Sequence, residues 1–376
     1  MKNRIYNRRH LTASTLVLLA LGCLSAANPL EIRNPNGDFI PSEKEKNVTV
    51  VPADTLKNGI SDDLGTSVKV FRSVVVDNDN NKWFITEKGI VSFDGKKWNL
   101  HNKNGKVPTQ DLTDFAYEVN PDGQKLWIAS SKGATVASLP LDEGTGATTF
   151  GTENTTIADN NVIKVAVGKS HLRWIGSVKG VAGFKDDHWL KSNYGDIYPE
   201  ELFHDYPITS MATNAEGDSV YVGTKGAGIA RLQRNDVDGI TGASVYAQWG
   251  PIKLPSDSIY SIFIAPDRTK WFGTDQGIAR HIGNLTLKNW TVFTTKDGLA
   301  DNFVQAITAD HSGKIWIGTK KGISVFDGVL WKSFTMDVKQ NSNNILCIAV
   351  DKTGIIWFGT DNGVISYENG DFKGYR

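Results

Sequence analysis

A repeated motif constrains this chain more than any other feature of its sequence. Each copy contains an aromatic residue that is followed by a small residue, by Thr or Ser, and then by Gly. Consecutive aromatics are 41 to 50 residues apart. Repeats of this length, made of short apolar runs between polar turns, are typical of all-β arrays rather than helical solenoids. The seven aromatics are Trp83, Trp127, Trp174, Tyr221, Trp271, Trp316 and Trp357.

One copy, at residues 303–335, indicates how the motif folds locally. Its turns contain Gly beside polar residues, at 310–313, 320–322 and 327–328. Gly can adopt the positive φ angles of tight turns, and Asp can accept hydrogen bonds from its own backbone. Four strands remain between these turns, at 303–309, 315–319, 323–326 and 330–335. The sequence therefore predicts an all-β fold, a seven-bladed β-propeller of four-stranded antiparallel blades over residues 58–376.

The first 27 residues have the composition of an export signal. A basic segment at 1–10 precedes an apolar run at 11–21 that is too short to span a bilayer. Residues 20–23 resemble a bacterial lipobox, which predicts cleavage before Cys23 and lipidation of that cysteine, whereas residues 25–27 would suit ordinary cleavage after Ala27. The first route gives a lipoprotein anchored in the periplasm or at the cell surface. The second gives a secreted or periplasmic protein.

Residues 28–57 are expected to form a tether between the signal and the propeller. They are polar, have prolines at 29, 35 and 41, and include one possible strand, Val48–Val51. Residues 371–376 already supply a fourth strand for the last copy. The strand at 48–51 could add to that last blade or compete for its place, so the sequence leaves the closure of the ring open.

Charge and composition argue against nucleic acid and cofactors. Removing residues 1–27 removes four basic and no acidic residues, which leaves 37 basic and 41 acidic residues and a net charge of −4. A nucleic-acid-binding protein would instead show a basic footprint. We expect no metal or other cofactor, because the histidines lack metal-binding spacing and Asn235–Gly239 lacks most ligands of a calcium loop. Cys347 lies in an apolar strand and is expected to be buried and inert.

The copies resemble the two-component regulator propeller repeat. Residues 298–302 and 310–327 follow the family pattern closely, 351–363 follow it well, and 77–94 follow it with Ile85 in place of Gly. The resemblance implies an exported, non-catalytic propeller like the sensor region of hybrid histidine kinases that act on polysaccharide breakdown. Its ligand would be a glycan or an envelope protein. Because the sequence ends at Arg376 with no later span or kinase, a partner would have to carry any signal.

A polysaccharide hydrolase or lyase on a propeller scaffold is the alternative function. Glycan hydrolysis needs two carboxylates at a separation set by the mechanism. The sequence contains no nucleophile motif of the Gly-x-Ser-x-Gly type, and its Asp-x-x-Gly turns differ in spacing from sialidase Asp-boxes. We therefore expect a binding protein without catalytic residues.

The first candidate ligand contacts are lysines in the second turn of several copies. If seven blades close, these turns ring one face and could attract an anionic ligand. The alternative is that Asp111, Asp159, Asp257 and Asp301, expected on the same face, neutralise them as weak surface pairs. The lysines are Lys88, Lys132, Lys179, Lys225 and Lys321.

The second group comes from the aromatic segment at residues 188–206, which joins two copies on the same face. It is expected either to bind a sugar or peptide at the mouth of the ring or to pack on itself as a lid. The proposed contacts are Tyr194, Tyr198, Phe203 and Tyr206.

The last candidate is Lys164, on an expected innermost strand. Ten or eleven residues before the aromatic, the other copies have small residues: Ser73, Ala116, Ser210, Ser261, Ala306 and Cys347. Small residues fit where blades converge, so a lysine there should point its ammonium into the central channel and need a partner. The alternative is a register shift by one, which would place Ile163 in this position.

Overall fold

The computed structural model describes most of the chain after residue 47. The described residues belong to the compact unit Glu45–Arg376. They are 48–51, 56–57, 59–65, 67–102, 105–141, 145–168, 171–192, 203, 205–214, 216–234, 239–246, 254–283, 285, 288–336 and 342–376.

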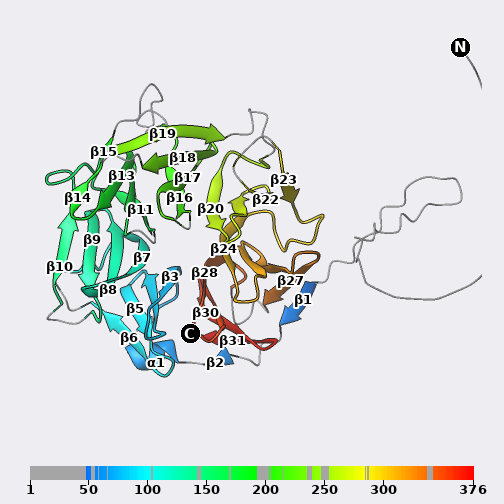
Figure 1. Ribbon diagram of the computed structural model, residues 1–376. Coiled ribbons are helices and arrows are strands. Elements are labelled where there is room, and N and C mark those ends of the chain that lie inside the picture. Colours follow the sequence, from blue (N-terminus) through cyan, green and yellow to red (C-terminus); the bar gives the residue numbers. More distant parts are fainter. Residues whose placement is uncertain are drawn as a thin grey trace, which may run out of the picture. The chain divides into compact units, whose positions relative to one another are not determined.

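Seven antiparallel sheets of four consecutive strands form the blades of a β-propeller, which confirms the predicted fold (Figure 1). We number the blades 1 to 7 along the chain. Each innermost strand contacts the innermost strands of both neighbouring blades, and β28 of blade 7 contacts β3 of blade 1, so the ring is closed. The innermost strands are β3 (Phe71–Val76), β7 (Leu112–Asn120), β11 (Val162–Val167), β16 (Ile208–Thr213), β20 (Ile259–Ile264), β24 (Val304–Ala309) and β28 (Ile345–Val350).

The outer three strands of every blade follow in chain order. The second strands are β4 (Lys82–Thr86), β8 (Gly123–Ser130), β12 (Arg173–Ser177), β17 (Ser219–Thr224), β21 (Lys270–Thr274), β25 (Ile315–Thr319) and β29 (Ile356–Thr360). The third strands are β5 (Gly89–Phe93), β9 (Gly133–Ser138), β13 (Gly180–Lys185), β18 (Ile229–Arg234), β22 (Ile278–His281), β26 (Gly322–Phe326) and β30 (Gly363–Glu368). The fourth strands are β6 (Trp98–His101), β10 (Ala147–Phe150), β14 (His188–Trp189), β19 (Gly239–Tyr246), β23 (Trp290–Phe293), β27 (Trp331–Met336) and β31 (Asp371–Tyr375).

Short segments add to the outer edges of three blades. β15 (Lys191–Ser192) pairs in parallel with β19, and β2 (Leu56–Lys57) pairs in parallel with β31 of the last blade. β1 (Val48–Val51) pairs in parallel with β27 of blade 6, so the expectation that it adds to the last blade or competes there is wrong. The helix α1 (Ile60–Leu64) follows β2, and the amides of Gly59 and Ile60 donate to the carbonyl of Arg376. The two ends of the propeller are thus joined beside blade 7.

Two hydrogen bonds explain why the motif has its spacing. In every blade, the hydroxyl of a Thr or Ser at the end of the second strand donates to the carbonyl of the Gly that begins or precedes the third strand, over 2.8–3.2 Å. In blades 1, 6 and 7, the Asp of the first turn also accepts the indole N–H of the Trp six residues later. These bonds are 2.8 Å for Asp77, 2.9 Å for Asp310 and 3.0 Å for Asp351. The Asp of this motif therefore has a structural role in these blades.

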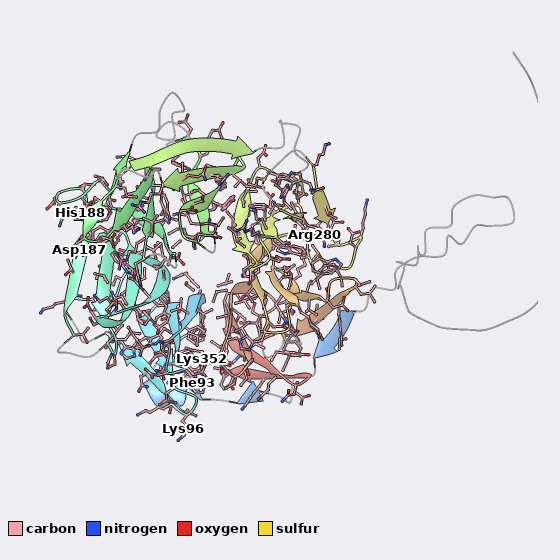
Figure 2. All side chains as sticks on the ribbon, viewed as in Figure 1. Phe93, Lys96, Asp187, His188, Arg280 and Lys352 are labelled. Atoms are coloured by element: carbon pink, nitrogen blue, oxygen red, sulfur yellow. The ribbon has the colours of Figure 1, made fainter. Side chains whose placement is uncertain are left out.

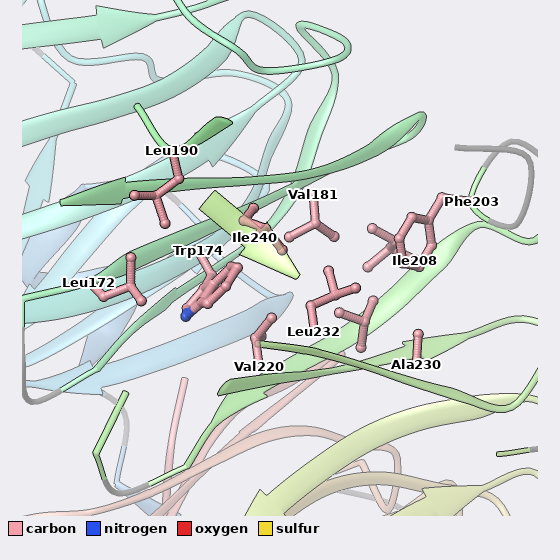
Figure 3. Packing of buried hydrophobic residues seen from close by; sticks show 11 residues of the cluster. Leu172, Trp174, Val181, Leu190, Phe203, Ile208, Val220, Ala230, Leu232 and Ile240 are labelled. Carbon is pink, nitrogen blue, oxygen red and sulfur yellow. The ribbon is translucent and has the colours of Figure 1, made fainter. Parts of the chain in front are cut away.

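The repeated aromatics are buried between blades, as the sequence predicts. All seven are at most 4% exposed. Between blades 3 and 4, for example, Trp174 and Val181 pack against Val220 and Leu232 (Figure 3). Side chains project from the blades into the spaces between them around the ring (Figure 2). Burial of this apolar surface is the main stabilising contribution to such a fold.

Candidate functional site

A β-bulge recurs at the same place in all seven innermost strands and defines one inner position in each blade. The pairing register between first and second strands shifts once per blade, and the residue after the shift lies opposite the small residue of the motif in blades 2 to 7. A bulge bends a strand and redirects its side chains. The seven inner positions are Ser73, Asp114, Lys164, Ser210, Ser261, Ala306 and Cys347.

The strand pairing confirms the prediction that Lys164 belongs to this ring of positions. The same prediction for Ala116 is wrong. Lys164 pairs with Gly176, and Ile163 is the residue skipped by the bulge. In blade 2 the strands β7 and β8 are longer, with nine and eight residues, so Ala116 lies opposite Trp127 and Asp114 takes the inner position. Counting back from the aromatic fails there because the long hairpin adds residues between the aromatic and the bulge.

Asp114 and Lys164 form an ion pair between the innermost strands of blades 2 and 3. The Lys164 ammonium lies 3.4 Å from Asp114 Oδ1, and the side chains are 27% and 14% exposed. Asp114 also accepts a hydrogen bond from the hydroxyl of Ser73 at 3.1 Å and one from the amide of Val165 at 3.4 Å. Both charges influence Cys347 electrostatically, although it belongs to blade 7. Three adjacent blades thus contribute to one polar site in the inner ring.

Cys347 is buried, and its thiol donates to the carbonyl of Phe71 over 3.4 Å. Burial raises the pKa of this thiol to about 12. A thiol with so high a pKa holds almost no thiolate at neutral pH, which agrees with the predicted inert role.

The five predicted lysines lie in exposed turns between second and third strands. Lys179 forms an ion pair with Asp159 at 2.9 Å, and Lys321 forms one with Asp301 at 3.0 Å. These are the neutralising pairs of the alternative hypothesis. For Lys88, Lys132 and Lys225, the described part of the chain contains no ion pair. Their role in binding an anion stays a prediction.

The aromatic segment before β16 is described only in part. Tyr194 and Tyr198 lie outside the described residues. Phe203 is 0% exposed and packs in the hydrophobic cluster of blades 3 and 4, so the prediction that it contacts a ligand is wrong (Figure 3). Tyr206 is 40% exposed. The burial of Phe203 favours the packed-lid alternative for that part of the segment.

Two buried ion pairs between blades were not anticipated from the sequence. Glu118 accepts two hydrogen bonds from Arg173, at 2.6 and 3.1 Å, and a third from the indole of Trp127. Lys82 lies 3.7 Å from Asp351. Each pair joins residues more than 50 positions apart, so sequence spacing alone could not have indicated it.

Several predicted features lie outside the described residues. Cys23 and the whole signal segment lie outside them, as do residues 235–238 of the weak calcium motif. Within the described ranges, His, Cys, Asp and Glu side chains form no group of three or more that could hold a metal ion. Among the same residues, no helix has the length and hydropathy needed to cross a bilayer.

Comparison with known proteins supports the family resemblance. The two-component regulator propeller family matches residues 298–321 and 339–362, in blade 6 and across the start of blade 7. This match confirms the resemblance that the motifs indicated. No curated protein sequence matches the chain significantly.

Solved structures share the fold. The extracellular domain of the putative hybrid two component system BT3049 from B. thetaiotaomicron is 20% identical, with a TM-score of 0.62, over 81% of this chain and 39% of that one. The corresponding domain of BT4673 from the same organism is 17% identical, with a TM-score of 0.61, over 82% and 39%. Virginiamycin B lyase from Staphylococcus aureus is 14% identical, with a TM-score of 0.57, over 81% and 96%. The chain therefore spans about two fifths of the length of the two sensor domains.

Proposed function

We propose that this chain, a propeller that contains two-component regulator propeller repeats, is an exported, non-catalytic binding protein whose ligand is a glycan. Its fold is that of extracellular domains of hybrid two-component systems. Because the chain covers only part of those domains, the proposal depends on its own residues. If no glycan binds in the experiment below, the alternative ligand is an envelope protein.

The observation that carries the proposal is the Asp114–Lys164 pair in the inner ring. Five blades fold with Ser, Ala or Cys at this position, so the fold does not require a charge there. The pair is partly exposed, and its carboxylate is held in place by Ser73. A fixed carboxylate beside an ammonium offers an acceptor and a donor to the hydroxyl groups of a sugar.

The proposal includes export of the protein and its anchoring to a membrane. The basic and apolar residues at 1–21 support translocation, and Cys23 would carry a lipid that holds the propeller at the membrane surface. The protein would then present its inner ring to ligands outside the cytoplasm, and a separate protein would respond to binding.

The test is binding of a panel of neutral and acidic oligosaccharides, measured by calorimetry on the wild-type protein and the Lys164→Met and Asp114→Asn variants. Any glycan that binds should lose on the order of tenfold in affinity in each variant, since each removes a charge-assisted hydrogen bond. Lys352→Met, which removes an exposed lysine of blade 7, is the control. Unchanged affinity in both inner-ring variants would refute the assigned site.

A further inference from the structure

Within the described residues, the groove between blades 5 and 6 holds a cation without the carboxylate partner that accompanies the cations between blades 7 and 1 and between blades 2 and 3. In three grooves, a cation lies between the motif Trp of the preceding blade and a Phe of the third strand of the following blade. Between blades 7 and 1, the Lys82 ammonium lies 5.0 Å from the ring of Trp357 and 5.5 Å from that of Phe93. Between blades 2 and 3, the Arg173 guanidinium lies 5.6 Å from both Trp127 and Phe184.

In the groove between blades 5 and 6, Arg280 of β22 supplies the cation. Its guanidinium carbon lies 5.6 Å from the ring of Trp271, 5.9 Å from Phe326 and 5.4 Å from Phe293. Figure 2 marks Arg280 on this blade. The same aromatic environment is therefore filled by a cation from a different strand.

The other two cations have a carboxylate partner from the preceding blade, and that carboxylate serves two donors. Asp351 lies 3.7 Å from Lys82 and accepts the indole N–H of Trp357 at 3.0 Å. Glu118 binds Arg173 at 2.6 Å and accepts the indole N–H of Trp127 at 2.8 Å.

Blade 5 has Ala265 where blade 7 has Asp351. Both residues lie six positions before the aromatic, and both begin a turn with the same backbone hydrogen bonds: each amide donates to the carbonyl four residues later, and each carbonyl accepts from the amide three residues later. The methyl group of Ala265 provides no acceptor. Within the described residues, Arg280 forms no ion pair, and its Nε is buried without a hydrogen bond. The Trp271 side chain lines the adjoining cavity, and no described side chain accepts its indole N–H.

A cavity lies at this position. It has a volume of about 800 Å³ and is lined largely by apolar groups, including Trp271, Phe263 and Ile282, together with Arg280. This volume is within the range of small-molecule sites, roughly 300–1,000 Å³. Two carboxylates also line it, but Asp267 accepts from Thr269 and Asp310 accepts from Trp316 and Ser312. Both are thus held in their own turns, and neither forms an ion pair with Arg280.

We propose that this groove binds the carboxylate of a sugar acid, which takes the place that Asp351 occupies in blade 7. The carboxylate would accept hydrogen bonds from the guanidinium of Arg280 and from the indole of Trp271. Burial lowers the pKa of Arg280. The apolar walls would contact the C–H face of the sugar ring. The site lies between blades 5 and 6 and includes none of the inner-ring residues, so it can be tested separately from the Asp114–Lys164 site.

The experiment follows the indole N–H signals of the eleven tryptophans by NMR in protein labelled with ¹⁵N-tryptophan. The probes are D-glucuronate and its neutral counterpart D-glucose, and Trp271→Phe identifies the Trp271 signal. We expect D-glucuronate to shift the Trp271 signal saturably and D-glucose to leave it unchanged. Arg280→Met should weaken D-glucuronate binding at least tenfold. The control Lys332→Met removes a surface lysine of blade 6 and should bind as the wild type does.

Ala265→Asp is the decisive variant, because it restores the carboxylate of the motif from within the chain. It should abolish the effect of D-glucuronate while the signals of the other tryptophans show an intact fold. Three results would overturn the proposal: no saturable shift with D-glucuronate, an equal shift with D-glucose, or a shift that persists in Ala265→Asp.

Discussion

Replacing Asp351 by Asn should destabilise the closure of the ring. Asp351 of blade 7 and Lys82 of blade 1 join the last and first blades, and their side chains are only 1% and 3% exposed. The Asn side chain keeps the size of Asp, but its NH2 group replaces one of the two oxygens that accept from the turn and from the Trp357 indole, so the change removes the negative charge and one acceptor. Lys82 would then be a buried ammonium without a counter-ion.

The expected cost is about 3 kcal/mol of unfolding free energy, at the lower end of the range for breaking a buried pair. The lower end applies because Lys82 also donates to the carbonyl of Asn80 at 2.8 Å and lies over Trp357. Burial already lowers the pKa of Lys82 despite the opposing effect of Asp351, so the lysine can also lose its proton. The double variant Lys82→Met/Asp351→Asn, which removes both charges, should recover the part of the loss that comes from the unpaired Lys82 ammonium.

Urea unfolding followed by tryptophan fluorescence measures these differences at pH 7. The control Asp122→Asn breaks an exposed pair with Lys125 and should change stability by less than about 1 kcal/mol. If Asp351→Asn costs no more than this control, or if adding Lys82→Met makes the protein still less stable, the reasoning about the buried pair is wrong.

The same carboxyl group predicts a dependence on pH. Burial alone would raise the pKa of Asp351, but hydrogen bonds from Thr353, Trp357 and the amide of Ile355 hold it below its ordinary value. A depressed folded-state pKa gives a stabilisation that is present above the ordinary pKa of Asp, about 3.9, and is lost as the pH falls through the folded value. The wild-type protein should therefore have a higher unfolding free energy than Asp351→Asn above about pH 4, and this difference should shrink as the pH falls below that value. A difference that is independent of pH in this range would contradict the assignment.

Two further predictions concern single side chains. Phe203→Ala should lower the unfolding free energy, measured with urea, by about 3–5 kcal/mol because Phe203 is fully buried. Tyr206→Ala should lower it by less than about 1 kcal/mol. Similar costs for the two variants would contradict the packing described for this segment. The two cysteines should behave oppositely: labelled palmitate should enter the wild type but not Cys23→Ser, and Cys347 should react with a thiol reagent only after unfolding, because its pKa is about 12. Palmitate label in Cys23→Ser would refute lipidation at Cys23. Rapid reaction of the folded protein with the thiol reagent would refute the inert role of Cys347.

The fold could be predicted from the sequence because the residues that determine the structure of a blade recur in each copy of the motif. The aromatic, the Thr or Ser and the Gly recur in nearly every copy, and each makes the same burial or hydrogen bond in each blade. The strand boundaries of blade 6 differ from those predicted by one residue at most. The segment at 48–51 carries no repeat signal, and its partner was therefore assigned to the wrong blade.

The candidate site was predicted less completely because it depends on contacts between blades. Lys164 stood out as a lysine among small residues, but its partner Asp114 was missed because the long hairpin of blade 2 displaces the count from Trp127. The absence of a carboxylate at Ala265 is visible in the sequence, yet its meaning depends on Arg280, which reaches the same groove from β22. Pairings of this kind follow from the packing of neighbouring blades and not from spacing along the chain.

The most direct test of the central claim, that this propeller binds and does not cleave, uses one sample for both questions. The wild-type protein is incubated with the glycan panel, bound glycans are identified after separation of the complex, and the masses of all glycans are recorded before and after. We expect saturable retention of at least one glycan with every mass unchanged. Shortened or unsaturated products, or retention of none of the glycans, would contradict it.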